Sequence, residues 1–129
     1  MTSPTARTLE VMVSLSLPPR DLWPNARPHH MAKARAAKAY RHEAKLAAKQ
    51  AMGRAVPVRW TEATIQATFR FTTARRRDPD NCLAALKAAF DGLRDAGLIA
   101  DDNRLTHLPV VIGRGELGGV TLRVEFSPP

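Results

Sequence analysis

Cysteine, long apolar stretches and acidic side chains are all scarce in this sequence. The single cysteine, Cys82, excludes an internal disulfide framework, and with only 4 histidines it also excludes a thiolate zinc ribbon. The longest apolar run is far shorter than a membrane-spanning helix requires, and the first residues lack the layout of a signal peptide. The 129 residues therefore predict one domain, residues 1–129, in a cytoplasmic setting without a membrane partner.

The shortage of acids is uneven along the chain. Against 20 Lys and Arg there are 12 Asp and Glu, a net charge of +8. Residues 1–77 carry 15 basic and 4 acidic side chains, whereas residues 78–129 carry 5 and 8. A domain this basic favours a polyanionic partner, most commonly nucleic acid. Six of the twelve acids bracket one predicted helix: Asp78, Asp80, Asp91, Asp95, Asp101 and Asp102.

Several well-known site motifs are also missing. The sequence has no glycine-rich phosphate loop, no Gly-x-Ser-x-Gly and no His-Glu-x-x-His. Asp78 and Asp80 could open an EF-hand loop, but Cys82 occupies its fifth position and no glycine follows at the sixth. These absences exclude the nucleotide-binding, hydrolase and metalloprotease classes that depend on those motifs.

Periodicity predicts an α+β domain. Alternating apolar residues predict four strands, at residues 9–17, 56–72, 108–112 and 120–126. Helical spacing predicts two helices, at residues 31–52 and from Asp78 to Gly97. The expected order is β-α-β-α-β-β around a small mixed sheet. Residues 18–30 hold four of the ten prolines, which predicts a loop, and residues 101–103 predict a polar turn.

Two stripes run along the helix predicted over residues 31–52. A thin apolar stripe consists of Tyr40, Ala44, Ala47 and Ala51. A basic stripe consists of Lys38, Arg41, Lys45 and Lys49. The basic stripe has two interpretations, a solvated face or a nucleic-acid contact made by Lys38, Arg41 and Lys45, and the pattern favours neither.

The junction Asp78-Pro79-Asp80 carries the first candidate site. Proline suits the first helical position, which makes Asp78 a natural N-cap, and capping alone explains such a pair in many proteins. In an extended stretch, side chains two residues apart also point the same way, so both carboxylates could face one point. Carboxylates without Cys or His are the ligand set for hard cations, Mg²⁺ above all. Capping and metal binding are both open.

A second acidic pair, Asp101 and Asp102, follows the same helix. Taken alone, the pair is better explained as a polar turn. If Leu98–Ala100 ran along the sheet beside residues 69–75, one of these acids would return toward Asp78 and Asp80. We expect that arrangement because acids in a basic protein gather here.

Arg75, Arg76 and Arg77 lie directly before the first acidic pair. Arginine forks onto two phosphate oxygens, so a triplet beside a metal site suits phosphate positioning. Together the three features predict a Mg²⁺-dependent phosphodiesterase that acts on nucleic acid.

Three segments resemble the RusA-type Holliday junction resolvases, a family of crossover junction endodeoxyribonucleases. Residues 75–81 read RRRDPDN, residues 86–93 read LKAAFDGL and residues 96–102 read AGLIADD. The opening, Leu15–Pro19 followed by a proline-rich loop with Asn25, is similar but less specific. The likeness covers nearly the whole chain.

The resemblance implies a homodimer that makes paired, Mg²⁺-dependent cuts in four-way DNA junctions during recombination and repair, with Mn²⁺ as a substitute. The family's catalytic and metal-binding acids fall on Asp78, Asp80 and Asp102, with Asp101 adjacent, and its functional lysine falls on Lys87. We expect DNA contacts from the arginine triplet, from the basic stripe and from the proline-rich loop: Arg75, Arg76, Arg77, Lys38, Arg41, Lys45, Asn25 and Arg27.

One departure concerns Lys87. Three extra residues separate it from Asn81 compared with the family spacing. On a continuous helix it would still lie seven residues from Asp80, on the same face. The other interpretation is a surface lysine paired with Asp91 one turn on.

Two alternatives to the resolvase remain open. One is a basic nucleic-acid-binding module without catalysis, in which the acids only cap and turn. The other is a nuclease of broader selectivity that cuts flaps or forks.

Overall fold

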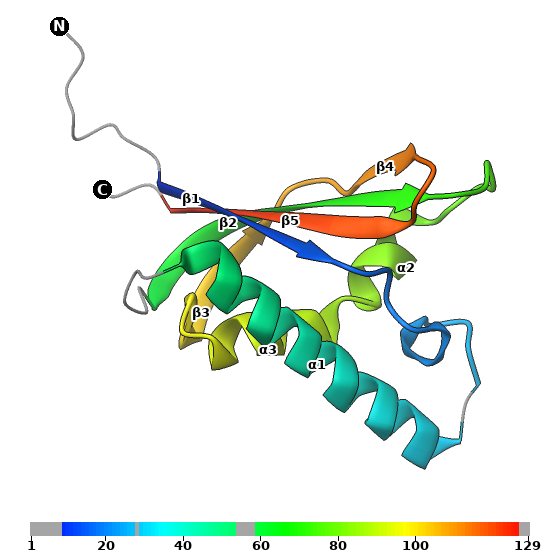
Figure 1. Ribbon diagram of the computed structural model, residues 1–129, viewed down its shortest axis with the longest axis horizontal. Helices are drawn as coiled ribbons and strands as arrows, with labels where there is room; N and C mark the ends of the chain where they lie inside the picture. Colours follow the sequence, from blue (N-terminus) through cyan, green and yellow to red (C-terminus); the bar gives the residue numbers. More distant parts are fainter. Residues whose placement is uncertain (1–8, 28, 54–58, 127–129) are drawn as a thin grey trace, which may run out of the picture.

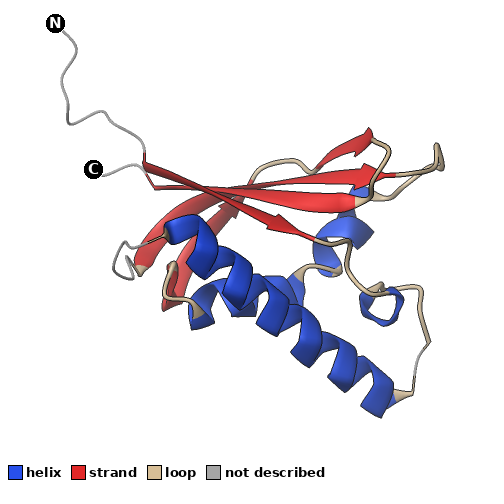
Figure 2. Cartoon of the chain, viewed as in Figure 1, coloured by secondary structure: helices blue, strands red, loops and turns tan. Residues whose placement is uncertain are grey.

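The computed structural model describes residues 9–27, 29–53 and 59–126, which form a sheet with its helices on one face (Figures 1 and 2). The elements in chain order are β1 (Leu9–Leu15), the short 3-10 helix η2 (Arg20–Leu22), α1 (His30–Met52), β2 (Trp60–Phe71), α2 (Pro79–Ala84), α3 (Lys87–Asp95), β3 (Ile99–His107), β4 (Val111–Arg114) and β5 (Gly119–Phe126).

The sheet is mixed, as expected for the predicted α+β class. Its strand order is β1-β5-β2-β3, and β4 also pairs with β2. β5 is antiparallel to β1 and β2, whereas β3 and β4 are parallel to β2. β3 lies along the first half of β2 and β4 along its last residues, so the two form one interrupted edge.

The alternation in β2 places one row of side chains under the helices. Ile65, Ala67, Phe69 and Phe71 are buried as predicted, opposite Val120, Leu122 and Val124 of β5. The intervening residues of both strands face away from the helices and are polar. One face of the sheet is therefore core and the other is open.

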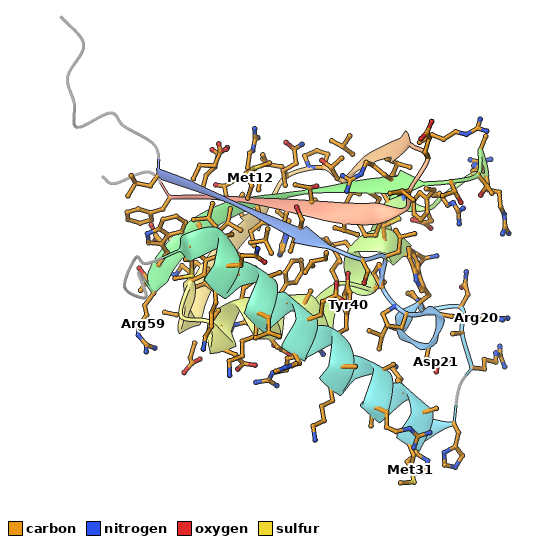
Figure 3. The ribbon with its side chains drawn as sticks, viewed as in Figure 1. Met12, Arg20, Asp21, Met31, Tyr40 and Arg59 are labelled. Carbon is orange, nitrogen blue, oxygen red and sulfur yellow. The ribbon has the colours of Figure 1, made fainter. Side chains whose placement is uncertain are left out.

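α1 packs on the sheet and on α3 through a stripe shifted from the predicted one. Tyr40, Ala44 and Ala48 are buried, whereas Ala47 is half-buried and Ala51 is exposed. Burial at every fourth residue follows the closest line of approach to α3 and corrects the expected stripe. Tyr40 lies between α1 and the sheet, where its hydroxyl donates to the Ser16 carbonyl oxygen at 2.8 Å (Figure 3).

Gly92 sets the approach of α3 to α1. A Cβ added at Gly92 would lie 2.7 Å from the Ala44 Cβ and 2.9 Å from the Lys45 nitrogen, and it would also meet the Arg41 carbonyl oxygen. Only a residue without a side chain fits at this crossing. The two helices therefore pack nearly backbone to backbone.

The single helix predicted from Asp78 to Gly97 is wrong in one respect, because it is divided in two. α2 ends at Ala84 and α3 begins at Lys87, with Ala85 and Leu86 buried between them. The apolar spacing of the segment fits one continuous helix, and the break lies within the region where the chain has its extra residues. Burial of the connecting residues stabilises the break against the propensity for a continuous helix.

The turn predicted at residues 101–103 is also a correction, since those residues lie in β3. Trp60 pairs with Ile99 and Glu62 with Arg104, so two steps along β2 correspond to five along β3. The three extra residues form a bulge in the edge strand. Because Ile99 pairs with Trp60, β3 starts beside the beginning of β2, and the expected course beside residues 69–75 is wrong.

Candidate active site and nucleic-acid interface

Asp78 and Asp80 lie where the chain enters α2, just beyond the end of β2. Asp78 is the N-cap, as predicted, and its Oδ1 accepts the Asp80 backbone N–H at 2.9 Å. Pro79 occupies the first helical turn. Both aspartates are exposed, and the Asp80 carboxylate makes no hydrogen bond or ion pair with any other described residue. Capping uses one oxygen of this pair and leaves the others free for a ligand.

Asp101 and Asp102 lie at the other end of the domain. Their backbone belongs to the bulge of β3, beside the first residues of β2, whereas Asp78 lies seven residues beyond Phe71, the last residue of β2. The 12 residues of β2 span roughly 36 Å. Figure 1 shows the start of β3 at the left of the molecule and α2 toward the right end of the sheet. The Asp102 side chain lies outside the described residues, and the described side chains contain no group of three metal ligands.

Lys87 is the first residue of α3, and its relation to Asp80 is not the one expected from a single helix. It lines a hollow with Leu22, Lys33 and Asp91, between α1, η2 and α3, which Asp80 does not line. The alternative pairing with Asp91 is also not seen, because Arg94 donates to the Asp91 carboxylate at 2.8 Å. The catalytic role of Lys87 stays a prediction.

The arginine triplet divides into two kinds of residue. Arg77 packs its guanidinium 4.0 Å from the centroid of the Phe71 ring and donates to the Thr73 hydroxyl at 3.0 Å. Arg75 and Arg76 are exposed. Arg77 therefore holds the loop that follows β2, and its two neighbours are the ones free to meet a phosphate.

Trp23 holds the proline-rich loop against the same ring. Its indole N–H donates to the Pro18 carbonyl oxygen at 3.1 Å. Its ring lies 6.0 Å from Phe69 and 6.3 Å from Phe71, between centroids. Because Trp23 and Arg77 both pack on Phe71, two loops far apart in sequence are held side by side.

Between these loops lies a hollow of about 660 Å³ lined mainly by polar residues. Its walls include Arg75 together with Asn25 and Arg27, so the structure brings together three residues predicted separately to bind DNA. Arg20, on η2 at the outer surface (Figure 3), adds a third arginine to the lining and was not predicted, and Asp21 adds one carboxylate. The signal for it was weak, since one arginine among prolines has no periodicity.

One residue of the basic stripe of α1 is already paired with an acid of the same domain. Arg41 donates to both oxygens of Asp95, at 2.6 and 2.8 Å. This hydrogen bond and the guanidinium charge lower the pKa of Asp95, with Lys45 adding to the effect. Lys38 is exposed. The contact predicted between Arg41 and DNA therefore competes with a bidentate pair inside the domain.

A model of the family described as Endodeoxyribonuclease RusA matches residues 17–125. The chain belongs to the RusA endodeoxyribonuclease family. The match includes both acidic pairs and both loops around the cationic hollow. Members of the RusA family are hydrolases that act on DNA junctions, so the chain is an endodeoxyribonuclease related to the Holliday junction resolving enzymes. No curated protein matches the chain. None of the helices among the described residues is long and apolar enough to cross a membrane.

Proposed function

We propose that this RusA-family protein is a Mg²⁺-dependent, homodimeric endonuclease that resolves four-way DNA junctions by paired hydrolysis in recombination and repair in the cytoplasm. The observation that carries the proposal is the position of Asp78 and Asp80. Two exposed carboxylates begin a helix, and Arg75, three residues before Asp78, lines a hollow with Arg20 and Arg27. Acids for a cation and arginines for phosphates therefore lie at the same end of the sheet.

The residues at the start of α2 fit a hard divalent cation. Mg²⁺ sites that act on phosphates commonly use one or two protein carboxylates, with water and phosphate oxygens supplying the rest. Asp80 and the second oxygen of Asp78 meet that need, and Mn²⁺ accepts the same oxygen ligands. When bound, such an ion polarises the phosphate and lowers the pKa of a bound water. The arginines anchor the flanking backbone and offset charge on the phosphate oxygens.

The third acid, Asp102 or its neighbour Asp101, comes in this proposal from the second subunit. One chain holds the two acidic pairs at opposite ends of β2, so a single copy does not bring their backbones together. A two-fold dimer that places the β3 bulge of one copy against the α2 start of the other creates two identical sites at once. Two symmetric sites are also what paired cuts require.

Mixed dimers test the shared site. Asp80→Asn and Asp102→Asn should each abolish cleavage as homodimers. In the mixed dimer both lesions fall in one composite site and the other site is intact, so Mg²⁺-dependent nicking of one strand returns. If all three acids belonged to one chain, each site would carry a lesion and nicking would stay absent.

Asp80→Asn alone also separates an enzyme from a binding module. The variant should lose cleavage while its affinity for a synthetic four-way junction stays equal or rises, because one charge that repels phosphate is gone. Glu10→Gln, which removes an exposed acid on β1, is the matched control and should keep both properties. Equal loss of binding and cutting in Asp80→Asn would contradict the metal-ligand role. Parallel assays on junction, fork and duplex substrates distinguish a resolvase from a broader nuclease.

A further inference from the structure

The loop between β4 and β5, residues 115–118, passes the end of β2 and carries an exposed leucine that the fold does not use. Leu117 is 82% exposed, whereas every other exposed large apolar side chain in the described residues is 55% exposed or less. Single exposed apolar residues are common on protein surfaces. A leucine this exposed contributes little to the stability of the folded state. Any role it has must therefore come from the neighbouring groups that surround it.

Those neighbours are the two loops of the cationic hollow. The Gly115 N–H donates to the carbonyl oxygen of Phe71, at 3.0 Å, where the loop with Arg75 begins. Leu17, which opens the proline-rich loop, lies so close to Gly118 that an added Cβ there would be 2.7 Å from its methyl carbon. Figure 1 shows the β4–β5 loop and the loop after β2 at the same end of the sheet.

We propose that Leu117 is the residue that recognises the branch point of DNA, by packing against the base-pair face exposed at the crossover. Linear duplex hides its base-pair faces in the stack, and a branch point opens them. Proteins that deform DNA use apolar side chains as wedges between base steps, with cationic groups holding the phosphates on either side. Leu117 has such neighbours, because the β4–β5 loop contacts the first residues of two loops that carry arginines. The inference rests on the proposed junction-resolving function and names the residue that selects the substrate.

The test measures base unstacking in the absence of Mg²⁺, so that no cleavage is required. A four-way junction carrying 2-aminopurine at the crossover should brighten when the full-length wild-type protein binds. In Leu117→Ser the brightening should disappear and junction affinity should fall about tenfold, the scale expected for burying one leucine side chain. Affinity for linear duplex and its salt dependence should not change. Leu117→Met should restore brightening.

Leu9→Ser is the matched control, since Leu9 is 44% exposed at the opposite end of the sheet, and it should behave as wild type. Unchanged brightening in Leu117→Ser would overturn the proposal. Sedimentation analysis covers the other use of an exposed leucine: if Leu117→Ser converts a dimer to a monomer, Leu117 is a subunit contact and the proposal is wrong. Failure of the proposed function has a different signature, namely no Mg²⁺-dependent nicking by the wild type whatever the fluorescence does.

Discussion

Two regions of this domain are basic, and they use their charge differently. On α1, Arg41 is held by both oxygens of Asp95, and Glu43 binds the Ser16 hydroxyl and backbone N–H. At the loop end of the sheet, Arg75 lines an open hollow with Arg20 and Arg27. In the first region Arg41 joins α1 to α3 and Glu43 joins α1 to the segment after β1, whereas Lys38 is exposed. The second keeps its arginines available, so basic composition alone does not locate a DNA interface.

The contrast extends to packing. The α1–α3 interface is a close crossing that depends on the missing side chain of Gly92. The loop end depends on one ring, because Trp23 and Arg77 both pack on Phe71. Substitutions in the helical layer should therefore lower the free energy of unfolding, and substitutions at the loop end should lower the affinity for DNA.

The largest expected effect on folding follows from Gly92→Ala. The new Cβ would press on the backbone of α1, and such overpacking typically costs about 1–3 kcal/mol. Urea unfolding should show that loss, while the salt dependence of DNA binding per folded molecule stays the same. Gly113→Ala is the control, since an added Cβ there meets only the Phe69 carbonyl oxygen at 3.8 Å. A neutral Gly92→Ala would show that α1 and α3 can separate without cost.

Local patterns predicted the elements whose determinants are local. The alternation in β2 identified its buried row, and the Asp-Pro pair identified the N-cap and first turn of α2. The break before Lys87 was not predictable, because the spacing of Leu83, Leu86 and Phe90 fits an unbroken helix. The break is determined by the burial of Ala85 and Leu86 in the folded domain. The bulge in β3 was missed for a related reason, since Asp-Asp-Asn is typical of a turn and only pairing with β2 keeps it in a strand.

In the candidate site, too, local features were predictable and features that depend on tertiary contacts were not. The DPDN motif marked the start of α2 correctly, and the role of both acidic pairs in catalysis stays a prediction. Their separation along β2 depends on where β3 pairs, which no local pattern encodes. The ion pair of Arg41 could not be predicted from local sequence, because its partner Asp95 lies 54 residues away along the chain.

Arg75→Ala sharpens the comparison at the loop end. If Arg75 neutralises one phosphate, the slope of log affinity against log salt should fall by about 0.9 for duplex arms, with weaker binding at every salt concentration. Arg77→Ala, two residues further along the same loop, should mainly destabilise the loop because the Arg77 guanidinium packs on Phe71. An unchanged slope in Arg75→Ala would remove that arginine from the interface.

The smallest expected effect concerns the pair that joins α1 to α3. Because Arg41 lowers the pKa of Asp95 in the folded state, the pair contributes stability that is fully present above the unfolded value, near 3.9, and is lost as the pH falls through the folded value. The difference in unfolding free energy between wild type and Asp95→Asn should therefore be constant from about pH 7 to about pH 5 and shrink below about pH 4. Glu116→Gln, which removes an exposed acid without an ion pair in the described part of the chain, should show no such trend. If Asp95→Asn instead strengthens DNA binding at neutral pH, the released Arg41 reaches DNA, α1 belongs to the interface and the two basic regions are one.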